Sequence, residues 1–509
     1  MAMRRFWCVE TCIFLGLWLV LMLAGRSMLL RDPGTFWHTV VGQRMLDQGA
    51  VLDADPFSFT RGGETWIAHQ WLSECTMAAL YRLGGWDTLL LATAALLAGV
   101  YTWLAGRMLR SGLHWLWAGG LLALVLLGSS PQFHIRPLLV TIGGMALLFA
   151  LLLDIEDGRR SPRWLWLLVP ACALWANLHG GVLAGWATAA LAAAGWTVGR
   201  WAGRPAPLRQ GRDVAELAAV LVLAAAAMLL NPYGLDLPRA WLTTLAMPLP
   251  MLIEEHGPLD LTKPFGWATL LLGAGYLATL AGVRPKQWRV AWLLPLLWLV
   301  LAIQRVRNAP LFAIMAALAI ADILPRTRWA PWLGRREVLL PQVEEEKRHG
   351  TPAAALLPAL LVGLALAMQL AGAEAPILGR GWARLDPTRW PVDLLPELKQ
   401  IEADHGSATP IFNDMKFGGF LIFHTPGLRV FIDDRCALYG TELLSAYDQA
   451  RRERPERLQP WQRRYGFRHA LVEPETEFDR YLGASPRWTL VRRGPAAALY
   501  RLTTSARGS

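Results

Sequence analysis

The chain has 509 residues, of which 54% are hydrophobic and only 17% are charged, and its mean hydropathy is +0.31. This composition excludes an ordinary soluble domain, because such domains carry more charge and a smaller apolar fraction. The formal net charge of +11 does not indicate a nucleic-acid partner, since the arginines concentrate in short loops between long apolar runs.

Apolar runs long enough to cross a bilayer recur along most of the sequence. A membrane-spanning helix needs about 20 such residues, and the first run is too long for the core of a signal peptide. The sequence therefore predicts a polytopic α-helical membrane protein with about eleven transmembrane helices. The predicted spans are residues 9–30, 86–106, 113–129, 137–153, 163–178, 181–198, 214–230, 264–282, 288–303, 309–324 and 353–372.

The loops between these spans differ in charge and predict an orientation. The N-terminal MAMRR and the arginine-rich loops, such as DIEDGRRSPR and GVRPKQWR, all fall on one side if the spans alternate. The positive-inside rule assigns that side to the cytoplasm. The loops that contain SSPQFHIRP, NLHGG, NPYG, EEHGPLD and QRVRN are then extracytoplasmic, so we expect the outer face to be the working face.

The first outer loop, residues 31–72, places acidic and histidine side chains among aromatic residues. Asp32 follows the first span and Pro33 ends that helix. The stretch FWHTVVGQRMLDQG has apolar residues at helical spacing, which predicts an amphipathic helix on the membrane interface. That helix would carry His38 and Asp32 toward a cavity. His69 begins the next helix, where it either contributes to the site or belongs to an interfacial aromatic belt.

Two further carboxylates in this loop are separated by one residue. Asp53 and Asp55 offer oxygen atoms of the kind that bind a divalent cation such as Mg²⁺ or Mn²⁺. Because Asp55 precedes a proline, it also suits a turn without any ligand. The sequence leaves both interpretations open, and we expect no other cofactor.

Three arginines lie at outward helix ends, where the positive-inside rule disfavours them. Arg136, Arg305 and Arg307 either reach toward lipid headgroups or hold a phosphate by paired charge-assisted hydrogen bonds. Their position beside an acidic loop predicts a lipid substrate that bears a phosphate. Asn177 and His179 interrupt an apolar stretch, which indicates a cavity or polar partners, and Asn231 either does the same or turns the chain.

Residues 374–509 have the composition of a globular domain. Short apolar runs at 419–423 and 429–432, and the segments HALVEP and AALYRL, predict strands. The segment AYDQARRERPERLQPWQRRYG predicts a helix interrupted by proline. We expect a small extracytoplasmic α/β domain at 374–509 after a membrane domain at 1–373. Five polar residues lie at predicted strand ends, where turns and a surface ion pair would explain them: Asn413, Asp414, Asp433, Asp434 and Arg435. Of these, Asn413, Asp433 and Arg435 are the candidates to contact substrate.

Several of these motifs together resemble a family of uncharacterised bacterial multi-pass proteins. The matching motifs are RDPGTFWHTVVGQRML, DADPFSFT, HQWLSE, WANLHGG, NPYG and FNDMKFGGFLIF with RVFIDDR, and they span nearly the whole chain. That family is similar to the GT-C superfamily of glycosyltransferases, which use polyprenyl-phosphate sugars. The similarity rests on the acidic first outer loop, the number of spans and the extracytoplasmic C-terminal domain.

The resemblance implies an integral membrane enzyme that transfers a sugar from a polyprenyl-phosphate donor to an extracytoplasmic glycan, lipid or protein. GT-C enzymes carry a catalytic Asp or Glu just after the first helix, and Asp32 occupies that position. The usual acidic doublet is absent because Pro33 follows, so Asp55 is the reserve candidate. A polyprenyl phosphate leaves without a general acid, so one base and a phosphate-binding arginine suffice, and a single displacement inverts the anomeric carbon.

The same resemblance implies a bacterial inner-membrane protein with a cytoplasmic N-terminus. His38, Asp55 and His69 would surround Asp32, and the C-terminal domain would guide the acceptor. Two other functions remain open: a lipid-linked saccharide transporter, which needs a path to both faces, and a non-catalytic subunit of an envelope assembly.

Overall fold

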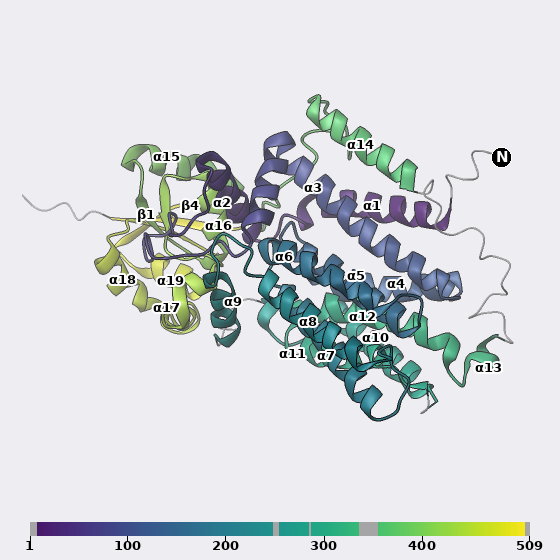
Figure 1. Cartoon of the computed structure of the whole chain (residues 1–509). Helices are drawn as coiled ribbons and strands as arrows, with labels where there is room; N and C mark the ends of the chain where they lie inside the picture. The colour runs from purple at the N-terminus through teal and green to yellow at the C-terminus, as the bar shows by residue number, and fades with distance from the viewer. Residues whose placement is uncertain (1–7, 248–253, 285–286, 335–354, 504–509) are drawn as a thin grey trace, which may run out of the picture.

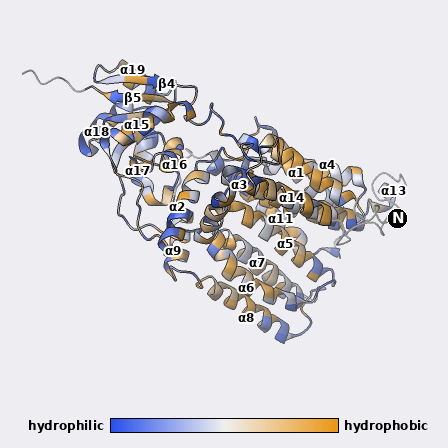
Figure 2. Ribbon diagram, turned by 90° about the horizontal axis from the view of Figure 1, so that it is seen from above, coloured by the Kyte–Doolittle hydropathy of each residue, from blue (hydrophilic) through white to orange (hydrophobic). Residues whose placement is uncertain are grey.

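The chain consists of a helical bundle with an α/β domain at one end (Figure 1). A computed structural model describes residues 8–247, 254–284, 287–334 and 355–503. The bundle is largely hydrophobic along its length, whereas the α/β domain mixes hydrophilic and hydrophobic segments (Figure 2). The predicted fold class, a polytopic helical protein with a small C-terminal α/β domain, is confirmed.

A helix lies over each predicted span. By length and composition, six helices among the described residues are able to cross a membrane, and two others, Ala291–Gln304 and Leu356–Leu370, are apolar but shorter. The bundle helices are α1 (Val9–Met28), α3 (Trp71–Arg110), α4 (Trp115–Ser129), α5 (Leu138–Glu156), α6 (Leu168–Leu178), α7 (Val182–Trp201), α8 (Gly211–Ala227), α10 (Pro264–Ala281), α11 (Leu294–Gln304), α12 (Ala309–Ile323), α13 (Ala330–Gly334) and α14 (Leu356–Leu370). The short α9 (Asp236–Ala246) lies near the α/β domain (Figure 1).

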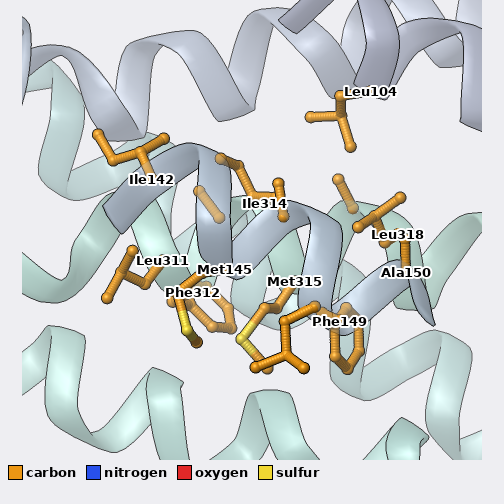
Figure 3. Close-up of a cluster of buried hydrophobic side chains, with 14 of the residues drawn as sticks. Leu104, Ile142, Met145, Phe149, Ala150, Leu311, Phe312, Ile314, Met315 and Leu318 are labelled. Atoms are coloured by element: carbon orange, nitrogen blue, oxygen red, sulfur yellow. The ribbon is translucent and has the colours of Figure 1, made fainter. Parts of the chain in front are cut away.

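Helix α12 forms the centre of the bundle. Every one of its side chains is buried, as expected for a helix that is apolar on all sides. Leu311, Phe312 and Met315 pack with Met145 and Phe149 of α5 (Figure 3). One continuous apolar core therefore fills the bundle between its two ends.

The α/β domain contains a mixed sheet of five strands in the order β2-β1-β3-β5-β4. The first three neighbours pair in parallel, and β5 pairs antiparallel with both β3 and β4. Its elements are α15 (Leu395–His405), β1 (Thr409–Asn413), α16 (Met415–His424), β2 (Leu428–Val430), α17 (Cys436–Arg452), α18 (Leu458–Tyr465), β3 (His469–Val472), α19 (Glu477–Ala484), β4 (Trp488–Arg493) and β5 (Ala498–Leu502). The predicted proline-interrupted helix is confirmed as α17 and α18, and HALVEP and AALYRL contain β3 and β5.

The strand predicted at 419–423 is wrong, because these residues lie in helix α16. The strand is instead β1, which ends just before α16 begins. Helix α16 is buried on nearly all sides between the sheet domain and the bundle. Its apolar residues therefore follow one another without helical spacing, and the sequence does not distinguish a buried helix from a buried strand.

Helix α2 (Gly34–Gln48) joins the bundle to the α/β domain. It is a helix as predicted, but ten of its 15 residues are buried, so it is not an exposed surface helix. It lies between α3 and α16, and both contacts need glycine. A Cβ at Gly42 would lie 1.9 Å from the backbone oxygen of Glu74, and a Cβ at Gly419 would lie 2.2 Å from that of Pro33.

The first outer loop also extends the sheet of the α/β domain. Ser58 forms a parallel bridge with Val430 of β2, supported by backbone hydrogen bonds from Phe59 and to Phe57. Apolar side chains of this loop share one core with those of residues 394–500. The loop and the α/β domain are therefore a single packed unit, although they lie more than 300 residues apart in sequence.

Candidate functional site

A cavity of about 730 Å³ lies where the bundle meets the α/β domain, and we call it the junction cavity. Its lining comes from the first outer loop, from residues 131–136, from residues 255–265, from the α11–α12 connection, and from the loops after β1, β2 and β3. Ligands of open α/β sheets bind at the carboxyl ends of parallel strands, and these three strands meet the cavity by those ends.

A second cavity, of about 940 Å³, lies at the other end of the bundle among the arginine-rich loops. Its lining includes Arg159 and Arg289, which pair with Asp157. The carboxylates predicted to do chemistry are absent from the described lining of this larger cavity, so the junction cavity is the candidate functional site.

Asp32 lies in the junction cavity at the start of α2. Its Oδ1 accepts a hydrogen bond of 2.8 Å from the backbone N–H of Gly34, which caps the helix. Its Oδ2 accepts a bond of 2.9 Å from Nη1 of Arg136. A carboxylate has about four acceptor positions, so each oxygen of Asp32 retains one for a substrate proton.

Arg136 bridges two carboxylates. Its Nη1 lies 2.9 Å from Asp32 and 2.7 Å from Oε2 of Glu255. Burial alone would lower the pKa of Arg136, but Asp32, Glu255 and Asp434 outweigh that effect and raise it. Burial likewise opposes the charge of Glu255, yet Arg136 and Arg307 hold the pKa of Glu255 well below its ordinary value. Arg136 is thus a charged group already occupied by protein carboxylates.

Asp434 is a second carboxyl group beside Asp32. An ideal Cβ on Gly34 would lie 2.6 Å from Oδ1 of Asp32 and 3.3 Å from Oδ2 of Asp434. Oδ1 of Asp434 accepts a bond of 2.8 Å from the indole N–H of Trp37. Burial and then the neighbouring Asp32 raise the pKa of Asp434 to about 8. At neutral pH Asp434 is therefore mostly protonated.

Arg307 lies on the same side of the cavity and is not occupied by a carboxylate. Across the residues that the structure describes it forms no ion pair, and its Nη1 lies 2.9 Å from Nε2 of His256. Burial and then Arg307 lower the pKa of His256 to about 4, so His256 is neutral and accepts the bond. Arg307 retains further N–H groups for an anionic ligand.

A further group of cavity-lining residues carries imidazole, amide and indole side chains and one buried carboxyl group. Nδ1 of His38 lies 2.8 Å from Oε1 of Glu74, and both side chains are almost inaccessible to solvent. Burial and then Arg136 hold the pKa of His38 well below its ordinary value, and burial lowers the pKa of His69 to about 4. We call Asp32, Arg136, Glu255, Arg307 and Asp434 the ionic side, and Trp66, His38, His69, Gln70 and Glu74 the neutral side.

The α/β domain supplies a third group of charges. Glu473, which follows β3, pairs with Lys416 at 3.1 Å and with Arg451 at 3.0 Å. All three line the junction cavity. Two cations on one carboxylate leave a positive edge where the α/β domain faces the cavity.

Asp55 lies outside the described cavity lining. Its Oδ1 pairs with Nη1 of Arg435 at 2.8 Å, and its Oδ2 accepts from the backbone N–H and the hydroxyl of Ser58. Arg435 also pairs with Asp433 at 2.7 Å, and Asp433 accepts a further bond from Tyr439. This buried network links the first outer loop to the α/β domain; of its members, Arg435 also reaches the cavity lining.

Asp53 and Asp55 do not form the divalent-cation site that the sequence suggested. Asp53 is exposed, whereas Asp55 is buried and its oxygens are occupied by Arg435 and Ser58. Among the described residues, no three His, Cys, Asp or Glu side chains come together as a group that could hold a metal ion. The residues predicted for a divalent cation do not fit one, and no chemical step below uses a metal.

Four other predicted residues have structural partners away from the described cavity lining. Asn177 accepts from the indole of Trp71 at 2.6 Å and donates to two backbone oxygens. His179 accepts from Thr141 at its Nδ1, Asn231 closes its own turn, and Asn413 ties β1 to the backbone of residues 431 and 432. Arg305, next to Arg307, lies outside the lining as well.

The site contains residues that the sequence did not single out. Glu255 and His256 lie in the loop EEHGPLD, which was predicted to be extracytoplasmic without a role. Asp434 was the neighbour of a chosen residue, Asp433, and two adjacent carboxylates after a strand point to different sides. The available signal was the acidity of the loop EEHGPLD, since outer loops after the first one otherwise carry few acidic residues.

Comparison with known proteins gives a fold but no close relative. No protein-family model and no curated protein matches the sequence. The oligosaccharyltransferase of Archaeoglobus fulgidus is similar in structure in its apo form, with a TM-score of 0.51 and 10% identity over 90% of this chain and 69% of that chain. The same enzyme tethered to an acceptor peptide with the NVT sequon has a TM-score of 0.51 and 14% identity over the same shares.

ArnT from Cupriavidus metallidurans bound to undecaprenyl phosphate has a TM-score of 0.48 and 15% identity, over 98% of this chain and 99% of that chain. The likeness to the oligosaccharyltransferase concerns the fold alone, because the identities are low. In its fold, the chain therefore resembles the GT-C glycosyltransferases, as the sequence motifs indicated.

Proposed function

We propose that this protein is an inverting glycosyltransferase that takes a sugar from a polyprenyl-phosphate donor and transfers it to an extracytoplasmic acceptor. The observation that carries the proposal is the ionic side of the junction cavity. It combines an accessible carboxylate, Asp32, with a cation free of carboxylates, Arg307, at the membrane-proximal end of the α/β domain. The GT-C fold supports the same class of reaction.

In the proposed reaction an acceptor hydroxyl oxygen attacks the anomeric carbon of the donor sugar. The bond between that carbon and the phosphate oxygen breaks, and the electron pair leaves with the polyprenyl phosphate. Asp32 receives the hydroxyl proton as general base. Arg307 stabilises the phosphate as its negative charge increases. A single displacement inverts the anomeric configuration.

The proposed role of Arg136 differs from the phosphate contact that the sequence predicted. Because it pairs with Asp32 and Glu255, it holds the base in place and does not bind the phosphate. Asp434, protonated at neutral pH, keeps a second negative charge away from Asp32. The positive edge at Lys416 and Arg451 lies where the α/β domain would guide the acceptor.

The membrane setting belongs to the proposal as well. We place residues 1–373 in a bacterial inner membrane with the N-terminus in the cytoplasm, and residues 374–509 outside it as an extracytoplasmic domain. The first outer loop then works together with that domain, since the two share a core. Transport is less well supported, because a continuous apolar core fills the described bundle between the junction cavity and the opposite end.

Reconstitution with a labelled donor tests this function. The full chain in nanodiscs would be incubated with undecaprenyl-phosphate sugars, radiolabelled in the sugar, and with envelope fractions. We expect label to leave the lipid phosphate and enter an acceptor only when the protein is present. A transporter would instead move intact labelled lipid across sealed vesicles, and that result would refute the proposal.

A further inference from the structure

The neutral side of the junction cavity contains a buried carboxylate oxygen that the proposed reaction does not use. Glu74 is 1% exposed, and its Oε1 is bonded to His38 at 2.8 Å. Its Oε2 is buried and has no hydrogen-bond partner in the described part of the chain. Buried polar atoms are nearly always paired, so an unpaired oxygen in a cavity wall points to a ligand that donates to it.

Residues near Glu74 in the cavity lining also have polar side chains without a hydrogen-bond partner among the described residues. The side chains of His69 and Gln70 line the cavity and form no hydrogen bond with other described residues. Trp66 lines the cavity as well, and its ring centroid lies 6.1 Å from that of Trp37. The Arg435 guanidinium lies over the Trp66 ring, 4.8 Å from its centroid. This side therefore offers uncommitted neutral donors and acceptors and one unpaired carboxyl oxygen.

We infer that the neutral side is the subsite for the sugar ring of the donor. A sugar presents several hydroxyl groups that donate to a carboxyl oxygen and to imidazole or amide acceptors. A phosphate would need a cation, and Arg307, which forms no ion pair among the described residues, lies on the ionic side. The donor lipid approaches from the membrane, and Glu74 lies in the first turn of bundle helix α3, so the donor sugar reaches it before an outside acceptor does.

His38 connects this subsite to the reacting centre. It is bonded to Glu74, and a Cβ on Gly34 would lie 3.3 Å from the His38 ring and 2.6 Å from Oδ1 of Asp32. A ring held by Glu74 therefore lies next to the base. The inference rests on the proposed function and names the residues that select its sugar.

The test separates recognition of the sugar from recognition of the phosphate. Affinities of the full chain would be measured for undecaprenyl phosphate and for undecaprenyl phosphate bearing glucose, galactose, mannose or N-acetylglucosamine. The readout is a ratio: the affinity for undecaprenyl phosphate that bears the preferred sugar, divided by the affinity for undecaprenyl phosphate itself. We expect Glu74→Gln to reduce that ratio by about tenfold or more, because it replaces a buried carboxyl oxygen that accepts a sugar O–H with an amide N–H group that cannot, while affinity for undecaprenyl phosphate stays within about twofold.

Glu64→Gln is the matched control, because Glu64 is an exposed carboxylate of the same loop that pairs with Arg61. It should leave both affinities unchanged. Gln70→Ala should reduce the ratio less than Glu74→Gln. If the Glu74 variant fails to fold, Gln70→Ala tests the subsite instead, because the Gln70 side chain forms no hydrogen bond with other described residues and its loss should not affect folding.

Three outcomes overturn the inference: an unchanged ratio in Glu74→Gln, an equal loss of both affinities, or a wild-type protein without any preference for the sugar. In all three the phosphate site remains supported as long as undecaprenyl phosphate binds. A wild-type protein that binds neither lipid would refute the proposed function itself.

Discussion

Replacing Asp55 distinguishes the two carboxylates that the sequence left as candidates for the base. The Asp55–Arg435 pair is fully enclosed, with side-chain exposures of 0% and 1% and a separation of 2.8 Å. Breaking a buried pair costs about 3–5 kcal/mol. Arg435 keeps its contacts with Asp433, so we expect Asp55→Asn to cost about 3 kcal/mol, which lowers Tm by roughly 10 °C.

The assay is thermal unfolding in detergent, followed by transfer measurements at a temperature where the variant is folded. Asp55→Asn should retain most of its transfer rate there, because its carboxylate lies outside the described lining of the junction cavity. Asp53→Asn, two residues away and exposed, should leave Tm unchanged. A variant at Asp55 with normal Tm and no transfer would show that Asp55 is the base and would refute this reasoning.

Three further predictions follow from the same contacts. Arg307→Met should weaken binding of undecaprenyl phosphate by about 10- to 100-fold, as measured by titration, because it removes a charged donor to the phosphate; unchanged affinity would contradict the phosphate role. Burial and the neighbouring carboxylate raise the pKa of Asp434 to about 8, so the wild-type transfer rate should fall above that pH as a second negative charge appears, and Asp434→Asn should lack that fall in a pH–rate profile. Gly419→Ala should lower Tm by an amount equivalent to about 1–3 kcal/mol, because its Cβ would lie 2.2 Å from the backbone oxygen of Pro33, whereas Gly363→Ala, with no atom within 4 Å, should not lower it.

The sequence predicted the features that depend on length, composition and charge. Each apolar run contains a helix, because crossing a bilayer requires one. The alternation of charge along the chain predicted that SSPQFHIRP, EEHGPLD and QRVRN lie on one face of the membrane. Residues of all three loops line the junction cavity.

The sequence could not predict features that depend on how distant segments pack. Asp433 and Asp434 are adjacent and chemically identical, but one pairs with Arg435 and the other faces Asp32, and only the path of the chain after β2 separates them. The residues of α16 are buried on nearly all sides, so helix and strand had the same apolar pattern.

Arg136 illustrates the same limit for charges. Its position at an outward helix end suggested a phosphate ligand, which Arg307 in fact matches better, because Arg136 is neutralised by Asp32 and by Glu255, 119 residues farther along the chain. The number of cations on a face was visible in the sequence, whereas their pairing was not.

The transfer rate of Asp32→Asn tests the central claim most directly. The substitution keeps the size of the side chain and an oxygen able to cap α2, but removes the base. The account predicts a transfer rate lower by at least about 100-fold, with folding and binding of undecaprenyl phosphate retained. A folded Asp32→Asn protein that transfers sugar at the wild-type rate would contradict it.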